Sequence, residues 1–298
     1  MQNHLLDQII AHFGQAEDTE PTILQRLRHA DSVFATQYAT ASVDASAAYG
    51  ELWVRAACLL RYLPHYTLQL GDLLQTLEGN AAVSAILSRP QLRHAALCGG
   101  PAPEPIALAV LHAQAGGQEL ISTVLDRQAD VLRDCWPLSA STAKAFSDHR
   151  SVQIDGRYTD LAQPPVVSEQ TLLASCQVLT MMNCLNELMS MGSERLRQQL
   201  MQRLQALAPG SLVLITDQAN YIPCERGMAM LQELLEGMGA RILVARTTKE
   251  DCHMMANRFD RSPRLVGVYG RAADQDGPFT KNYRVNNSAL QLAAVLPG

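Results

Sequence analysis

The sequence changes its pattern at Pro90, and this change constrains the fold more than any other feature. After Pro90, short apolar runs alternate with helical stretches, which is typical of βαβ units built around a parallel sheet. Breakers such as Ala208-Pro209-Gly210 and Gly239 separate these stretches. We predict an α/β fold with helices ending near residues 115, 207 and 238 and about seven strands, at residues 93–98, 120–125, 151–158, 177–182, 211–216, 241–245 and 265–269.

The first 90 residues show a different pattern, with apolar residues every three to four positions and few β-branched runs. This period predicts helices rather than strands. Residues 61–67 place Pro64 among two tyrosines and a histidine, so we expect one helix to end there and another to begin. The sequence therefore predicts a helical N-terminal cap at 1–90 and an α/β domain at 91–298.

Composition excludes several classes of protein. The 298 residues are 47% apolar, which is enough for a sizeable core. There is no apolar run of about 18 residues, and the start Met1-Gln2-Asn3-His4 lacks the blocks of a signal peptide, so we expect a cytoplasmic protein. The 24 Lys and Arg against 29 Asp and Glu form no basic stripe for nucleic acid. Seven cysteines without a C-x-x-C pair predict reduced thiols and no metal site.

The segment Cys98-Gly99-Gly100-Pro101-Ala102-Pro103-Glu104 lies between the first predicted strand and a helix. Such a turn needs glycine where the backbone approaches a ligand, and the positive end of the helix then faces electron-rich ligand atoms. The nicotinamide fingerprint G-x-G-x-x-G is absent, so a nucleoside without phosphates fits the turn better than a dinucleotide. A tight turn with no ligand is the alternative interpretation of the two glycines.

This turn resembles the first motif of the S-adenosylmethionine-dependent methyltransferase superfamily, in particular of members that read G-G-G-P-G-S-E. The resemblance covers about residues 90–272, and two glycines of the motif are replaced, by Cys98 and Ala102. It implies a Rossmann-like class I sheet, S-adenosylmethionine as a substrate, and no metal. The turn residues that it implies for binding are Cys98, Gly99, Gly100, Pro101 and Glu104.

Asp126 ends the second predicted strand, 26 positions after Gly100. A carboxylate there can accept hydrogen bonds from two neighbouring ribose hydroxyls, so we expect Asp126, with Arg127 beside it, to contact the nucleoside. The alternative role for Asp126 is a helix N-cap. Near the third strand, Asp155 and Asp160 are both candidates for the adenine edge.

Asn183 ends the fourth predicted strand, where methyltransferases place groups that face the methionine portion and the acceptor. Its amide both donates and accepts, which makes it a candidate for ligand binding and for catalysis. Capping of the next helix is an equally good and compatible interpretation. Trp136 is a candidate to flank adenine, although core packing suits a tryptophan better.

Tyr62 and Tyr66 lie in the proline-containing stretch of the helical cap. Aromatic faces attract a sulfonium cation, and phenols can orient an amino acid carboxylate. We name Tyr62 as a candidate ligand contact and Tyr66 as a candidate catalytic residue, with core packing as the alternative for both. Of the histidines, His112 is expected to be structural, and His149, in a loop, is a candidate base.

The leading functional prediction is transfer of the sulfonium methyl group to a small molecule, mainly by holding nucleophile and methyl in line. A second interpretation is a cyclase that releases methylthioadenosine, as in azetidine-2-carboxylate synthases, or a nicotianamine-like aminocarboxypropyl transferase. A third is a non-catalytic Rossmann-like binding module. The expected partner is a small-molecule substrate, with no membrane and no nucleic acid, and the sequence leaves the oligomeric state open.

Overall fold

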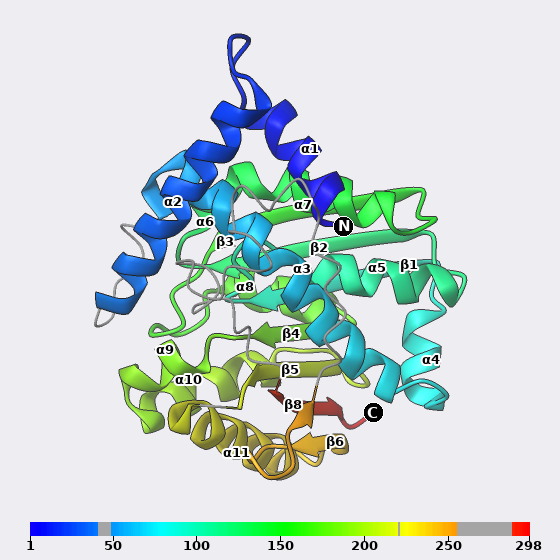
Figure 1. Ribbon diagram of the computed structural model, residues 1–298. Helices are drawn as coiled ribbons and strands as arrows, with labels where there is room; N and C mark the ends of the chain where they lie inside the picture. The colour runs from blue at the N-terminus through cyan, green and yellow to red at the C-terminus, as the bar shows by residue number, and fades with distance from the viewer. Residues whose placement is uncertain (41–48, 220, 255–287) are drawn as a thin grey trace.

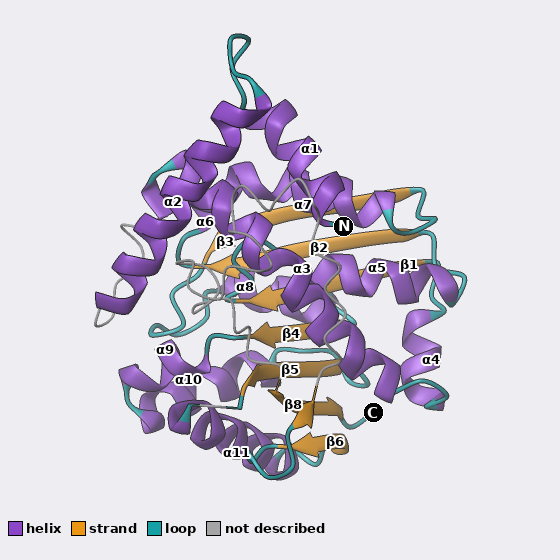
Figure 2. Ribbon diagram, viewed as in Figure 1, coloured by secondary structure: helices purple, strands orange, loops and turns teal. Residues whose placement is uncertain are grey.

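The computed structural model describes residues 1–40, 49–219, 221–254 and 288–298. At its centre lies a mixed sheet with helices on both faces (Figures 1 and 2). The strands follow the order β3-β2-β1-β4-β5-β8-β6, and β7 pairs with β8. The strands are β1 Gln91–Leu97, β2 Glu119–Asp126, β3 Ser151–Tyr158, β4 Val178–Met182, β5 Leu212–Gln218, β6 Arg241–Arg246, β7 His253–Met254 and β8 Ser288–Val295.

The strands β1 to β5 are parallel, whereas β8 is antiparallel to β5, β6 and β7. Since β5 and β6 are both antiparallel to β8, they point in the same direction. The carboxyl ends of β1 to β6 therefore meet at one edge of the sheet, which we call the carboxyl edge. In open α/β sheets, ligands bind outside this edge.

Helices cover the two faces and form two cores. Leu92 of β1 belongs to a core shared with α1 to α7, whereas Ala95 and Leu97 belong to a second core shared with α8 to α11. The helices are α1 Gln2–Phe13, α2 Glu20–Thr40, α3 Leu52–Thr76, α4 Ala81–Leu87, α5 Glu104–Gln114, α6 Ala129–Leu132, α7 Trp136–Ala145, α8 Val167–Ser175, α9 Leu185–Leu188, α10 Ser193–Gln205 and α11 Ile222–Gly237.

Six of the predicted strands are present, each within two residues of its expected ends. The seventh, at residues 265–269, lies outside the described residues. In addition, the sequence predicted neither the two-residue strand β7 nor the longer strand β8. The residues of β8, Ser288–Val295, are mostly alanine and leucine, which favour helices in isolation, and pairing between β5 and β6 makes them a strand.

The helix break expected at residues 61–67 is wrong, because α3 is one helix with Pro64 inside it. An internal proline removes one backbone hydrogen bond and costs about 3 kcal/mol. Pro64 is nevertheless buried, and so are most of the residues around it, where α3 packs against α2 and α5. Burial of this apolar surface outweighs the cost of the proline.

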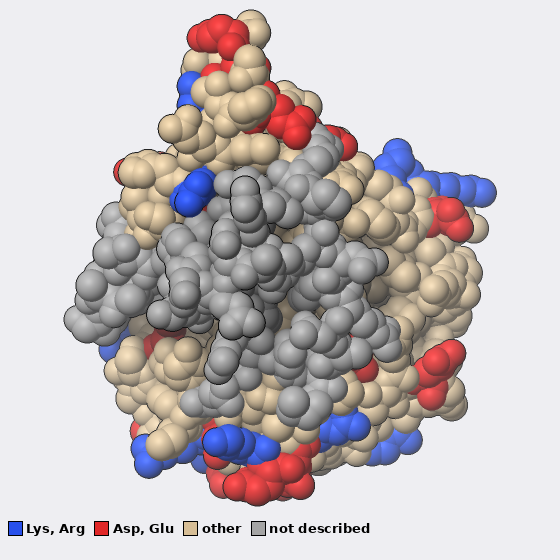
Figure 3. All heavy atoms as spheres, viewed as in Figure 1, with Lys and Arg blue, Asp and Glu red and all other residues tan. Residues whose placement is uncertain are grey.

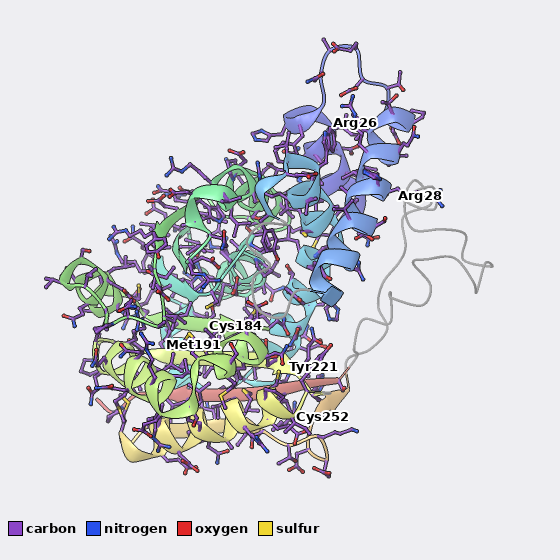
Figure 4. The ribbon with its side chains drawn as sticks, turned by 90° about the vertical axis from the view of Figure 1, so that its left-hand side faces the viewer. Arg26, Arg28, Cys184, Met191, Tyr221 and Cys252 are labelled. Carbon is purple, nitrogen blue, oxygen red and sulfur yellow. The ribbon has the colours of Figure 1, made fainter. Side chains whose placement is uncertain are left out.

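The pair α1 and α2 projects from the rest of the molecule (Figure 4). Arg26 of α2 pairs with Asp18 at 2.7 Å and lies over the ring of Trp53 on α3, 5.3 Å from its centroid. On the face shown in Figure 3, Lys and Arg side chains lie near the outline of the molecule and alternate with acidic ones. Within the described ranges, no helix is both long and apolar enough to cross a bilayer.

Candidate functional site

The turn after β1 has an unusual backbone. Cys98, Gly100 and Ala102 have φ of 53°, 49° and 63°, so left-handed conformations occur at both positions where the resembling motif has glycine and this chain does not. Gly99 is needed for packing instead, because a Cβ there would lie 2.6 Å from the Cβ of Ala96. At Gly100 a Cβ would meet no described atom within 4 Å, so the backbone there is open to a ligand.

Side chains from two helices hold the carbonyl groups of this turn. Trp136 and Ser139 of α7 donate to the carbonyl oxygens of Gly100 and Pro101, at 3.1 and 2.6 Å. Thr67 of α3 donates to the carbonyl oxygen of Pro103 at 3.2 Å. The turn is therefore held in shape by contacts that leave the space beside Gly100 free.

Asp126, at the end of β2, lies beside this turn. Its Oδ2 accepts the backbone N–H of Gly100 at 3.0 Å, and its Oδ1 accepts that of Gln128, the N-cap residue of α6, at 2.7 Å. Burial raises the pKa of Asp126, and the two N–H donors offset part of the rise. Each carboxylate oxygen keeps a second lone pair with which it can accept a ligand hydroxyl. Contact with a ribose stays a prediction.

Glu104, the first residue of α5, is fully buried. Neither of its carboxyl oxygens has a hydrogen-bond partner in another described residue. Burial raises its pKa to about 8, its own backbone N–H offsets part of the rise, and the charge of Asp126 adds to it. A buried carboxyl group without a partner is rare in folded proteins and indicates either a protonated acid or a missing ligand.

Asn183 follows β4 at the same edge, with a left-handed φ of 50°. Its amide pairs with that of Gln69 on α3. The Nδ2 of Asn183 donates to Gln69 Oε1 at 2.9 Å, and the Nε2 of Gln69 faces Asn183 Oδ1 at 3.4 Å. The backbone N–H of Asn183 is taken by the carbonyl oxygen of Thr216 at 3.0 Å. The helix α3 thus extends over the ends of both β1 and β4.

The strand order identifies the fold class. It reverses direction between β1 and β4, and the antiparallel strand β8 is inserted between β5 and β6. The fold is that of the class I S-adenosylmethionine-dependent methyltransferases. The turn from Cys98 to Glu104 and the residues Asp126 and Asn183 lie at the switch point, where ligands of open α/β sheets bind.

No protein-family model matches the sequence, and no curated protein matches it. Solved structures with a similar arrangement include an S-adenosylmethionine-dependent methyltransferase from Clostridium acetobutylicum, with a TM-score of 0.47, 7% identity and coverage of 83% of this chain and 100% of that one. The N-methyltransferase NodS from Bradyrhizobium japonicum has a TM-score of 0.41 and 14% identity, covering 79% and 98%. The [4+2]-cyclase SpnF has a TM-score of 0.40 and 15% identity, covering 94% and 97%. At these TM-scores, the similarities specify neither substrate nor reaction.

The two candidate tyrosines lie on α3. The rings of Tyr62 and Tyr66 stack with centroids 5.5 Å apart, and both pack against the core as partly buried groups. Arg61 lies over the ring of Tyr62 at 5.2 Å and pairs with Asp31 at 3.1 Å. Both tyrosines therefore take part in packing, and their roles at a ligand stay predictions.

The remaining candidates are Asp155, Asp160, Arg127 and Trp136. Asp160 follows the carboxyl end of β3, whereas Asp155 is exposed in the middle of that strand. Arg127 is exposed beside Asp126. Trp136 is buried in the core, and a Cβ at Gly156 would collide with its ring.

The histidine expected as a base lies elsewhere. His149 precedes β3 at the opposite edge of the sheet, where its Nε2 contacts His112 Nδ1 at 2.6 Å, and His112 Nε2 faces the carbonyl oxygen of Arg89 at 2.7 Å. The structure therefore places the candidate base His149 away from this site. His112 is structural, as expected, because it fills the space beside Gly117.

Sequence reasoning missed Thr67, Gln69 and Ser139. All three act over long sequence separations on the backbone or amide of another element, and no local pattern marks such a role. Within the described residues, no group of three or more His, Cys, Asp or Glu could hold a metal ion, and the seven cysteines are free thiols.

Proposed function

We propose that this protein is an S-adenosylmethionine-dependent transferase that acts on a small molecule, with methyl transfer as the leading reaction. The buried and unpartnered carboxyl group of Glu104 at the start of α5 carries this proposal. A helix N-terminus otherwise attracts anions. With a carboxyl group already there, the site favours a ligand that brings positive charge and N–H donors.

The charges at the turn favour S-adenosylmethionine over phosphate-bearing nucleotides. Glu104 and Asp126 are close enough for the charge of Asp126 to raise the pKa of Glu104. The Asp126 carboxylate repels a pyrophosphate and attracts the sulfonium and ammonium groups of S-adenosylmethionine, and such a cation also favours ionisation of Glu104. In this proposal Cys98, Gly99, Gly100 and Pro101 form the ligand loop, and Asp126, with Arg127 beside it, holds the ribose.

Under this proposal α3 contributes the groups nearest the reacting end of the ligand. The stacked Tyr62 and Tyr66 offer aromatic faces to the sulfonium, and Asn183, held by Gln69, faces the methionine portion and the acceptor. Methyl transfer then requires only that nucleophile and methyl group are held in line, without a metal.

A second reaction at the same site is supported by the raised pKa of Glu104, about 8. Once ionised, a carboxylate of this basicity can accept a proton from the amine of S-adenosylmethionine. The freed amine can attack the γ-carbon, with methylthioadenosine as leaving group, which is the reaction of an azetidine-2-carboxylate synthase. Attack by a second amine would give aminocarboxypropyl transfer.

Mass spectrometry of the protein incubated with S-adenosylmethionine alone separates these reactions. If S-adenosylmethionine binds but stays intact, methyl transfer is favoured, and candidate acceptors are screened next. Methylthioadenosine with a new amino acid establishes the cyclase instead. Binding without turnover under any acceptor would indicate a binding module, and no binding at all would overturn the proposal.

The role of Glu104 has its own test in proton release. If the neutral acid of the free protein becomes a carboxylate beside a bound cation, binding releases protons at pH 7, since this pH lies below the pKa of about 8. Calorimetry of S-adenosylmethionine binding in two buffers of different ionisation enthalpy measures this release. We expect Glu104→Gln to abolish it and to weaken binding. Equal proton release in the variant would contradict the role of Glu104.

A further inference from the structure

A row of three polar side chains crosses the other half of the carboxyl edge. Thr216 of β5 lies opposite Gln291 of β8, and Gln291 lies opposite Arg246 of β6. Thr216 and Gln291 are fully buried, and Arg246 is partly buried. Opposed residues on antiparallel strands have Cβ atoms about 4.5–5.5 Å apart, so the three side chains are neighbours. The helix α3 packs against β5 and β8.

Hydrogen bonding fixes the direction of the Gln291 amide. Arg246 Nη1 donates to Gln291 Oε1 at 2.6 Å, and because a guanidinium can only donate, the amide nitrogen must face away from it. That nitrogen and the hydroxyl oxygen of Thr216 have no hydrogen-bond partner in the described part of the chain. Two adjacent buried donors without an acceptor indicate that an acceptor is missing.

Among the described residues, Arg246 has no direct counter-ion. The Nη1 that donates to Gln291 also lies 3.3 Å from His253 Nδ1, and His253 Nε2 lies 3.5 Å from Asp72 of α3. No carboxylate of the described residues forms an ion pair with Arg246. Within the described part of the chain, the Nε and Nη2 donors of Arg246 form no hydrogen bond, and these donors and the charge can serve another group.

We propose that Thr216, Gln291 and Arg246 bind the carboxylate of a substrate, which deepens the proposed function by naming the chemistry of one substrate group. A carboxylate supplies two acceptor oxygens and the negative charge that this row lacks. Asp126, in the other half of the edge, and Glu104 whenever it is ionised repel the same group, so the two halves differ in the charge that they favour. The carboxylate is either that of S-adenosylmethionine itself or that of the second substrate.

Two variants and one control test the row. Thr216→Val keeps the shape and removes a hydroxyl that has no described partner, so the variant stays folded, with an unchanged or higher midpoint of thermal unfolding. Arg246→Gln removes the charge. Arg241→Gln is the matched control, because Arg241 is exposed at the opposite end of β6. The probes are S-adenosylhomocysteine, methylthioadenosine, which has no carboxylate, and benzoate with benzamide as its neutral counterpart.

We expect the two row variants to weaken carboxylate binding about tenfold or more, with the control unchanged. If calorimetry shows that the row variants bind S-adenosylhomocysteine more weakly but methylthioadenosine as tightly as the wild type, the bound carboxylate is that of S-adenosylmethionine. A loss of benzoate but not benzamide binding, measured by saturation-transfer NMR, identifies the second substrate. If both variants bind all probes like the wild type, the row has only a structural role. If the wild type binds neither nucleoside, the proposed function fails, and the benzoate comparison still decides on the row.

Discussion

A substitution at Gly100 tests the ligand-loop hypothesis most directly. Its φ is +49°, and an added Cβ would meet no described atom within 4 Å, so alanine fits but strains the backbone. We expect Gly100→Ala to lower the free energy of unfolding by about 1–2 kcal/mol. It should also weaken S-adenosylhomocysteine binding, because the methyl group takes up space where the ligand approaches.

Gly116 provides the control for this variant. Its φ is +91°, it has the same open surroundings, and it lies before β2 at the opposite edge of the sheet. Gly116→Ala should cost similar stability in urea unfolding and leave the affinity in calorimetry unchanged. Equal affinities of the two variants would mean that the turn is only structural.

Single residues were predictable where a residue type suited to ligand binding directly follows a predicted strand. Gly100 and Asp126 follow predicted strands, and the structure joins them by a hydrogen bond of 3.0 Å. The partner of Asn183 was not predictable, because Gln69 lies 114 positions away on a helix that was expected to break nearby. The left-handed backbone of Cys98 and Ala102 could be suspected only from the glycines of the resembling motif.

At the scale of elements, α7 holds the turn after β1 in shape, and a substitution at Ser139 tests this role. Ser139 is fully buried, and its hydroxyl donates to the carbonyl oxygen of Pro101 at 2.6 Å. Ser139→Ala leaves that acceptor without its partner, so we expect a loss of about 1–3 kcal/mol in urea unfolding and weaker S-adenosylhomocysteine binding. Ser141→Ala, on the same helix, loses only a bond to Gln8 and should keep the affinity. Unchanged affinity in both variants would contradict the role of α7 in holding the turn.

Elements were predictable where the local pattern agrees with the tertiary environment. The buried parallel strands are continuous apolar runs, and β4 is buried at every residue. Two of the failures are elements whose local preference is overridden. Pro64 lies inside α3 because burial compensates for its missing hydrogen bond, and Ser288–Val295 is a strand because β5 and β6 lie on either side of it.

At the scale of the whole molecule, acid stability depends on a histidine at the centre of the sheet. His94 of β1 contacts Ser122 of β2 at 2.6 Å and Thr180 of β4 at 2.8 Å, and burial lowers its pKa to about 3. Its folded-state pKa is below the ordinary 6.5, so the neutral form stabilises the protein above pH 6.5. This stability is lost as the pH falls from about 6.5 towards 3.

His94→Gln, which cannot titrate, isolates this contribution. Buried carboxyl groups such as Glu104, with a raised pKa, act in the opposite direction over the same range, so the wild type and the variant must be compared at each pH. In urea unfolding at pH 7, 6, 5 and 4, the stability advantage of the wild type over the variant should shrink steadily. A constant difference would rule out His94 as the source.

Unfolding of the whole molecule also tests the predicted division into a helical cap at 1–90 and an α/β domain at 91–298. The helix α3 shares one core with the sheet, and Thr67 and Gln69 bond to the turn after β1 and to Asn183. These contacts should make the helices and the sheet unfold together. The chain has only two tryptophans, Trp53 on α3 and Trp136 on α7, so Trp136→Phe and Trp53→Phe each leave one probe in one part.

We expect each single-tryptophan variant to give a urea transition by fluorescence that coincides with its own transition by far-ultraviolet circular dichroism. The reason is that opening α3 exposes the apolar surface of the core that also packs against β1 and β5, so neither part retains a closed core alone. If the Trp53 signal changed at lower urea than the circular dichroism of the same variant, the first 90 residues would be a separately unfolding cap. In that case the carboxyl edge of the sheet would remain folded after its cover had opened.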